Sequence, residues 1–223
     1  RSKGNNDMII SLLLQNTRGH RCGGVLITLR HVLTTASCTY TYGSAGDYRV
    51  FAGSVLLTDM SSPELFRMVV NITRHPDYTG APMFVNDIAI MTLNVPFNST
   101  VVTPLPLPHE SFQPAEGAEC VTAGWGSQDI TTTTSNENKL FVKLELFKQG
   151  DYGNGLVCNG GLAGILSMSS FCTVDTFPEV YTRVANYTTW IRNVTGAAST
   201  FQPGLAALML FTVAQLITAK IIS

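Results

Sequence analysis

Apolar, β-prone stretches recur along most of the chain, and clusters of Gly, Pro, Asn, Asp and Ser separate them. No helical period intervenes between these stretches, so the pattern predicts an all-β protein built as a sandwich or as barrels. The strands expected in the first half are Met8–Gln15, Cys22–Ile27, Val32–Ala36, Tyr48–Gly53, Phe66–Arg74 and Asp87–Leu93. Those expected in the second half are Ala118–Gly124, Leu140–Phe147, Gly155–Cys158, Leu162–Met168 and Glu179–Val184.

Three further stretches differ from this pattern. Phe97–Pro114 carries four prolines and is expected to be an extended crossover between two halves. Tyr187–Asn193 is expected to form a short closing helix. Gly204–Ile222 is almost wholly apolar, and as a helix it would extend about 28 Å, barely the thickness of a bilayer core. This tail is read as a glycosylphosphatidylinositol-anchor signal, as a C-terminal transmembrane anchor, or as a helix packed on the domain.

Composition narrows the class of protein. The chain has 223 residues, of which 45% are hydrophobic and 13% charged, enough for one large all-β domain or two small ones. A net charge of −1 without a run of Lys or Arg argues against nucleic acid or an acidic membrane surface as the main partner. Because the chain begins at Arg1, it is expected to be a mature or partial sequence.

Cysteines and sequons point to the secretory pathway. The five cysteines form no C-x-x-C pair, so neither a metal nor another cofactor is expected. Four N-x-[ST] sequons, together with spaced cysteines, favour an extracellular glycoprotein. These candidate glycosylation sites are Asn71, Asn98, Asn186 and Asn193.

The glycine-rich turn within Gly150–Gly160 is the candidate centre of any chemistry. A turn of this kind can present one side chain and two backbone N–H groups to a substrate carbonyl, as acyl transfer requires. The presented residue here is Tyr152, which follows the acid Asp151. A phenol titrates near pH 10 and is a poor nucleophile unless another group activates it.

Six blocks in this order resemble the trypsin-type serine proteases of the chymotrypsin fold. The blocks are Cys22–Ile27, Val32–Cys38, Asn86–Ile90, Thr122–Gly126, Gly150–Gly160 and Val180–Val184, the last leading into Tyr187 and Trp190. Together they cover residues 8–192, and six ordered blocks are far more specific than any lone motif. The resemblance implies a protease domain over residues 1–195 with two antiparallel barrels of the six-stranded type, about 8–96 and 115–192. Residues 196–223 would form a linker and the hydrophobic tail.

The same resemblance implies that two of the three catalytic positions are lost. Asp87 matches the family's aspartate, Ser37 stands at the histidine position and Tyr152 at the serine position. Gly150 and Tyr152 match the oxyanion-hole positions. Asp87 itself is expected to hydrogen-bond its surroundings rather than to retain a chemical role. His31 is expected to be structural, and His20, His75 and His109 to lie on the surface.

Departures from the family pattern surround this site. In the family, the acid at the position of Asp151 pairs with an N-terminal amine that is released by cleavage. The family's N-terminal sequence after that cleavage has no counterpart in Arg1–Asp7. Ser127–Gln149 is much shorter than the corresponding family segment, so the second barrel is expected to lack a strand, a helix and one pocket wall. Two explanations stay open, compensation by neighbouring segments and an incomplete or exon-skipped product.

Cysteine pairing and the specificity pocket are likewise inferred from the resemblance. Cys22 would pair with Cys38 and Cys120 with Cys158, which leaves Cys172 without its family partner and available for a disulfide-linked dimer. The positions that match the specificity pocket are Leu146, Ser167, Met168, Ser169 and Glu179. Because the family usually keeps glycine where Glu179 stands, a blocked pocket is expected.

Taken together, the residues predict a secreted or membrane-tethered serine protease homologue that is inactive and binds or regulates protein partners not identified by the sequence. A second hypothesis is residual or unconventional hydrolysis, with Ser37 or Tyr152 activated by another base. A third is a truncated product without function.

Overall fold

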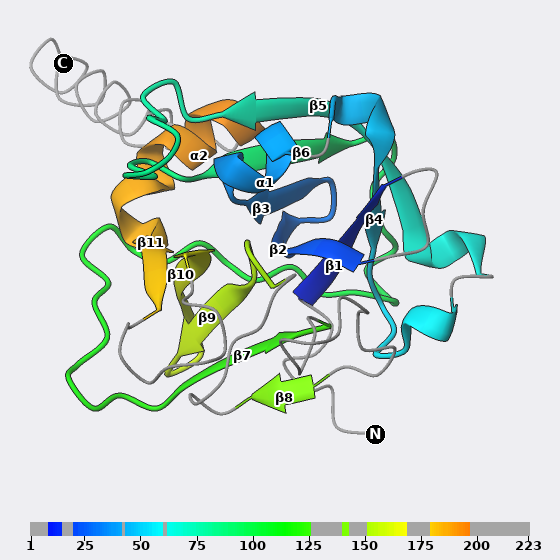
Figure 1. Cartoon of the computed structure of the whole chain (residues 1–223). Helices are drawn as coiled ribbons and strands as arrows, with labels where there is room; N and C mark the ends of the chain where they lie inside the picture. Colours follow the sequence, from blue (N-terminus) through cyan, green and yellow to red (C-terminus); the bar gives the residue numbers. More distant parts are fainter. Residues whose placement is uncertain are drawn as a thin grey trace, which may run out of the picture.

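The computed structural model describes residues 9–14, 20–41, 43–59, 62–125, 140–142, 151–168 and 179–196 (Figure 1). The predicted all-β architecture is confirmed, because two antiparallel sheets and a short C-terminal helix account for most of the regular structure. The two sheets pack together along a seam, where Val25 and Leu33 of the first meet Val157 and Ile165 of the second.

Six strands of the first half close into a barrel in the order β1-β2-β3-β6-β5-β4. These strands are β1 (Ile9–Leu14), β2 (His20–Thr28), β3 (His31–Thr34), β4 (Tyr48–Phe51), β5 (Phe66–Arg74) and β6 (Ala89–Leu93). Pairing of β1 with β4, through Ser11 opposite Phe51, completes the ring. Alternate strand residues such as Leu26, Val50 and Met91 fill its interior, which is the arrangement that the alternating pattern requires.

Five strands of the second half form a sheet in the order β11-β10-β9-β7-β8. They are β7 (Cys120–Gly124), β8 (Leu140–Val142), β9 (Gly155–Cys158), β10 (Gly161–Met168) and β11 (Val180–Arg183). Among the described residues this sheet has one strand fewer than the first and does not close. Most of the short segment before Gly150 lies outside the described residues, so the loss of a strand there stays a prediction.

Two α-helices and four 3₁₀ turns complete the described chain. The helices are α1 (Ala36–Thr41) and α2 (Thr188–Thr195), and the turns are η2 (Ala45–Asp47), η3 (Leu57–Asp59), η4 (Pro63–Leu65) and η5 (Val184–Tyr187). The expected closing helix is α2, which ends at Gly196 in the left-handed conformation that favours glycine. Neither α1 nor α2, the only α-helices in the described ranges, has the length and apolar character needed to cross a bilayer.

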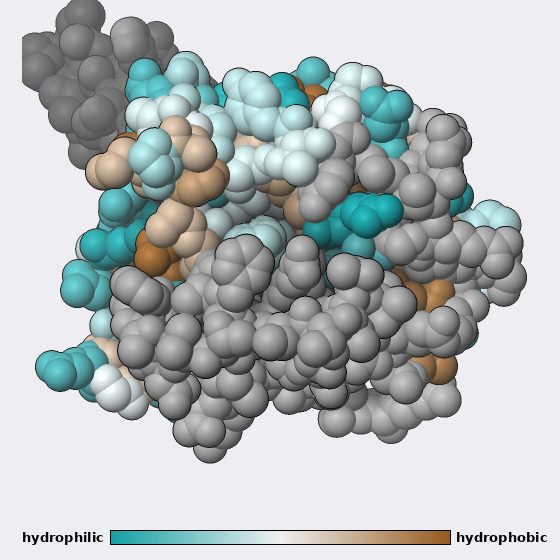
Figure 2. All heavy atoms as spheres, in the orientation of Figure 1, coloured by the Kyte–Doolittle hydropathy of each residue, from teal (hydrophilic) through white to brown (hydrophobic). Residues whose placement is uncertain are grey.

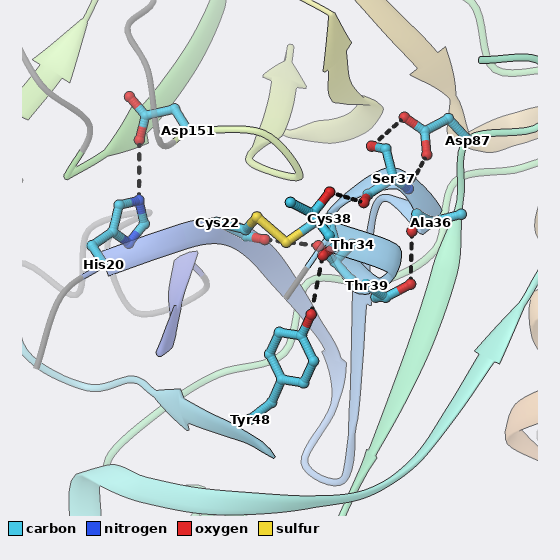
Figure 3. Close-up of a disulfide and its surroundings, with 12 residues drawn as sticks. His20, Cys22, Thr34, Ala36, Ser37, Cys38, Thr39, Tyr48, Asp87 and Asp151 are labelled. Atoms are coloured by element: carbon cyan, nitrogen blue, oxygen red, sulfur yellow. Dashed lines mark hydrogen bonds and ion pairs between the residues drawn. A yellow bond between two sulfur atoms is a disulfide. The ribbon is translucent and has the colours of Figure 1, made fainter. Parts of the chain in front are cut away.

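The start of α1 differs from the sequence prediction, which extended a strand to Ala36. The chain instead forms a helix from Ala36, because a disulfide and two hydrogen bonds hold the backbone in this conformation. Cys38 is joined to Cys22, the Tyr48 hydroxyl donates to the Cys38 carbonyl at 3.0 Å, and the Thr39 hydroxyl donates to the Ala36 carbonyl at 2.7 Å (Figure 3). These contacts fix the backbone around Ser37.

The two sheets share one apolar cluster. Val25 and Leu33 of the barrel pack with Val157 and Ile165 of the second sheet, and Ile191 of α2 joins them. The predicted crossover crosses this cluster as an extended segment without strands or helices between residues 97 and 114. Burial of these side chains holds the two sheets and α2 together.

Candidate active site

Asp87 is the centre of a buried hydrogen-bonded cluster. Its side chain has no exposed surface, and it lies just before β6, between Asn86 in a left-handed conformation and the apolar Ile88. The Ser37 backbone N–H donates to Asp87 Oδ1 at 2.7 Å, and the Ser37 hydroxyl donates to Oδ2 at 2.8 Å (Figure 3). The Ser167 hydroxyl donates to the same Oδ2 at 2.7 Å. Three residues singled out from the sequence therefore meet, from α1, the loop before β6 and β10.

Burial dominates the electrostatics of this cluster. Desolvation raises the pKa of Asp87, while the hydrogen bonds from Ser37 and Ser167 act in the opposite direction. Tyr78 lies beside the cluster, where burial and the charge of Asp87 raise the pKa of its phenol to about 12. Tyr78 therefore stays protonated near neutral pH and cannot take a proton from Ser37.

The turn after residue 150 is held by the first barrel. The Gly23 N–H donates to the Tyr152 carbonyl at 2.8 Å, and the Thr34 hydroxyl donates to the Gly23 carbonyl at 2.9 Å. Gly153 adopts φ 89°, a conformation that few other residues tolerate, and its N–H donates to the Leu166 carbonyl at 2.8 Å. The backbone at Tyr152 is thereby fixed between the two sheets.

Asp151 is paired with His20 in the described residues. His20 Nε2 lies 3.7 Å from Asp151 Oδ1 (Figure 3). The Asn154 side-chain amide donates to the same oxygen at 2.9 Å. His20 is buried, at 7% exposure, and its ring packs against Trp125. The expectation that His20 lies on the surface is wrong. Strand alternation carried the signal for its burial, because His20 is two residues before the buried Cys22 and shares its face of β2.

None of the four histidines is bonded to Asp87 within the described chain. His31 accepts or donates a bond with the Thr28 hydroxyl at 2.8 Å, and burial lowers its pKa, as suits its predicted structural role. His109 is exposed and bonded to Ser111, as predicted. His75 is only partly buried and packs against the rings of Tyr187 and Trp190. In the described residues, the side chains that bond to the Asp87 carboxylate are the hydroxyls of Ser37 and Ser167.

A cavity of about 300 Å³ opens beside this cluster, and two predicted pocket residues, Ser167 and Met168, line it. Glu179 is not among its lining residues; it accepts a hydrogen bond from the Tyr181 hydroxyl at 3.0 Å. Leu146 and Ser169 lie outside the described residues, so a blocked specificity pocket stays a prediction. Gly150 also lies outside them, and the oxyanion-hole assignment is untested for the same reason.

Comparison with known proteins identifies the family. The family model described as Trypsin matches residues 1–146 and 133–191. Granzyme M of Rattus norvegicus is 33% identical over 82% of this chain and 83% of that protein, and granzyme M of Homo sapiens is 32% identical over 83% and 84%. The chain belongs to the trypsin family of serine proteases. The solved structure of human heparin binding protein matches it with a TM-score of 0.74 and 27% identity, over 87% of this chain and 94% of that one.

Both disulfides that trypsin-family resemblance predicted are confirmed. Cys22–Cys38 ties β2 to α1 beside Ser37, and Cys120–Cys158 ties β7 to β9 behind the turn. Cys172 lies outside the described residues. Disulfides and membership of the trypsin family are consistent with an extracellular protein.

The raised pKa of Asp87 predicts a specific pH dependence of stability. Because the folded state binds this proton more tightly than the unfolded state, the associated stability is complete below the ordinary value of 3.8 and is lost as pH rises through the native pKa. Asp87→Asn removes this loss, so the unfolding free energy of the variant relative to wild type is expected to increase with pH and then level off. Urea unfolding across the acidic range measures it; parallel profiles for the two proteins would contradict the assignment.

Proposed function

We propose that this trypsin-family chain does not hydrolyse peptides and acts as a binding or regulatory protein on the protease scaffold. The observation that supports the proposal is the partner of Asp87. A serine protease needs an imidazole there, which takes a proton from the attacking hydroxyl while the aspartate orients it. The Ser37 hydroxyl donates to Asp87 instead, at 2.8 Å, and offers no basic nitrogen.

The nucleophile position supports the same proposal. Tyr152 stands where the family has serine, and a phenol without an adjacent base attacks an amide poorly. Tyr78, a nearby ionisable group, is held protonated at neutral pH by its raised pKa of about 12. Within the described part of the chain, the site therefore combines a weak nucleophile with no imidazole bonded to Ser37 or Asp87.

A fluorophosphonate probe tests this proposal directly, because it labels activated serine nucleophiles covalently. We expect no labelling of the purified full chain at neutral pH, and background turnover against a broad peptide library. Active trypsin labelled in the same tube shows that the probe is competent. Stoichiometric labelling that Ser37→Ala or Tyr152→Phe abolishes would overturn the proposal.

One contact favours a second candidate function, residual hydrolysis by Ser37. Its hydroxyl donates directly to a carboxylate, which is a possible acceptor for its proton. Two features weigh against this candidate: Ser167 donates to the same carboxylate oxygen, and a carboxylate is a weak base for a serine hydroxyl. Peptide turnover that disappears in both Ser37→Ala and Asp87→Ala would support it. A cooperative thermal unfolding transition would in turn exclude the third reading, a product that does not fold.

The proposed setting is the secretory pathway, with protein partners, without nucleic acid, and with the C-terminal tail as a tether. All four sequon asparagines, Asn71, Asn98, Asn186 and Asn193, are exposed in the structure, which is a requirement for carrying glycans. A disulfide-linked dimer through Cys172 is part of the same proposal and is read out by non-reducing electrophoresis of wild type against Cys172→Ser.

A further inference from the structure

The cavity beside Asp87 has an apolar rim that faces solvent. It lies between the loop after β5, the end of β10, β11 and the turn η5. Met83 and Val180 line it and are 72% and 44% exposed, and Phe84 and Met168 form more of its wall. Figure 2 shows apolar residues at the surface on the left of the view, where β11 lies in Figure 1. Apolar side chains exposed at the mouth of a cavity gain free energy when another group covers them.

The rim is a fixed feature of the fold. In the loop after β5, the Phe84 N–H donates to the Gly80 carbonyl at 2.8 Å and the Asn86 side-chain amide donates to the Asp77 carbonyl at 2.9 Å. The Tyr187 hydroxyl, from η5, donates to Asn86 Oδ1 at 2.9 Å. These bonds tie the loop that carries Met83 to the chain just before α2, so the two sides of the cavity keep their distance.

Asn186 stands on that same side of the cavity. It lines the cavity, its residue is exposed, and it is the first residue of a sequon that ends at Thr188. Its side chain makes no hydrogen bond within the described part of the chain. The amides of Asn71 and Asn98, in contrast, are each bonded to the hydroxyl of their own sequon threonine. Asn186 is thus the sequon whose substituent would begin inside a partly apolar cavity.

We propose that an N-linked glycan on Asn186 folds over this cavity and covers Met83 and Val180. This inference rests on the proposed passage through the secretory pathway. The first sugar of such a glycan has apolar ring faces, an acetamido methyl group and hydroxyls. That mixture suits a cavity whose lining combines apolar and polar side chains. The apolar ones are Met83, Phe84, Met168 and Val180, and the polar ones include Asn86, Thr182 and Arg183. Covalent attachment at the rim gives the sugar a high effective concentration there, so weak contacts suffice.

Burial of the sequon threonine implies that the glycan is attached before the chain folds. Thr188 has no exposed surface, and its hydroxyl donates to the Ala185 carbonyl at 3.2 Å. The enzyme that transfers the glycan must contact this hydroxyl as well as the Asn186 amide. Both groups are accessible together only in the unfolded chain. The glycan is therefore present when η5 and α2 dock against the loop after β5, and the cavity forms around it.

Methionine oxidation tests the proposal, since a covered thioether reacts more slowly with peroxide. The full chain is produced in mammalian secretory cells, and glycan occupancy is read at each sequon by peptide mass spectrometry after amidase treatment. We expect Asn186 to be occupied, and Met83 in Asn186→Gln to be oxidised about threefold faster or more than in wild type. Native amidase treatment of wild type, which removes the whole glycan and leaves aspartate at position 186, is expected to give the same increase.

Matched controls isolate the effect. Met68, half-buried on β5, is expected to react at one rate in all samples, and Asn71→Gln, which deletes a different sequon, is expected to leave Met83 unchanged. Occupancy at Asn71 or Asn98 without occupancy at Asn186 would overturn this inference alone, as would equal Met83 rates. Four unoccupied sequons would overturn the secretory route as well, whereas fluorophosphonate labelling concerns only the proposed loss of catalysis.

Discussion

Replacing Gly153 by alanine is expected to destabilise the folded protein by about 4 kcal/mol, the largest effect we expect from a single methyl group. Two causes add. Gly153 has φ 89°, where an L side chain is strained, and a Cβ atom there would collide with the Gly23 carbonyl oxygen and the Thr34 hydroxyl. Because one of these atoms belongs to the backbone of β2, no rotamer change relieves the contact. Urea unfolding of the purified variant measures the loss.

Gly160→Ala is the matched control. Gly160 also has a positive φ, of 78°, but nothing lies within 4 Å of a Cβ built there. We expect this variant to lose only the conformational part, about 1 kcal/mol. Similar losses at Gly153 and Gly160 would show that the turn moves away from β2 readily and that the seam is looser than the structure indicates.

Asp87→Ala is expected to cost about 3 kcal/mol of stability, because it leaves the Ser37 N–H and two hydroxyls in a buried site without their acceptor. The cost comes from the bonds at 2.7, 2.8 and 2.7 Å that converge on this carboxylate. Thermal and urea unfolding of the variant measure it. A large loss assigns Asp87 a structural role in the fold.

Asp77→Ala is the control for this prediction. Asp77 is an exposed carboxylate in the loop after β5, and its hydrogen bonds in the described structure use its backbone. We expect a change within about 0.5 kcal/mol, as for most surface substitutions. If Asp87→Ala were equally mild, the cluster around Asp87 would be an incidental arrangement rather than a support of the fold.

Strands were predictable where apolar alternation meets turn residues. The bounds Phe66–Arg74 agree between sequence and structure, because Pro63 and Pro76 punctuate a β-branched run. The helix α1 was not predictable from its Ser, Cys and Thr residues, which have modest helix propensity. Its conformation depends on the Cys22–Cys38 bond and on Tyr48, both of which lie outside the local sequence.

The sequence identified the residues of the candidate site but not the hydrogen bonds and ion pairs between them. Family resemblance placed Ser37, Asp87 and Ser167 near one another, yet assigned Ser167 to a pocket wall. Its hydroxyl instead serves Asp87, which is 80 residues away in the chain. Pairing of His20 with Asp151 escaped notice for a similar reason, since a lone histidine between polar residues gives no local sign of a buried partner more than a hundred positions later.

The contacts between the barrel and the turn at Tyr152 make the two halves of the chain depend on each other for folding. β2 supplies Gly23 and His20 to a segment that belongs, by sequence, to the other half. Residues of the first half therefore hold part of the second half in its native conformation. If the chain is cleaved in the crossover, the two fragments are expected to fold only when they are mixed. The same contacts constrain the evolution of each half, because a substitution in one half must remain compatible with the residues it contacts in the other.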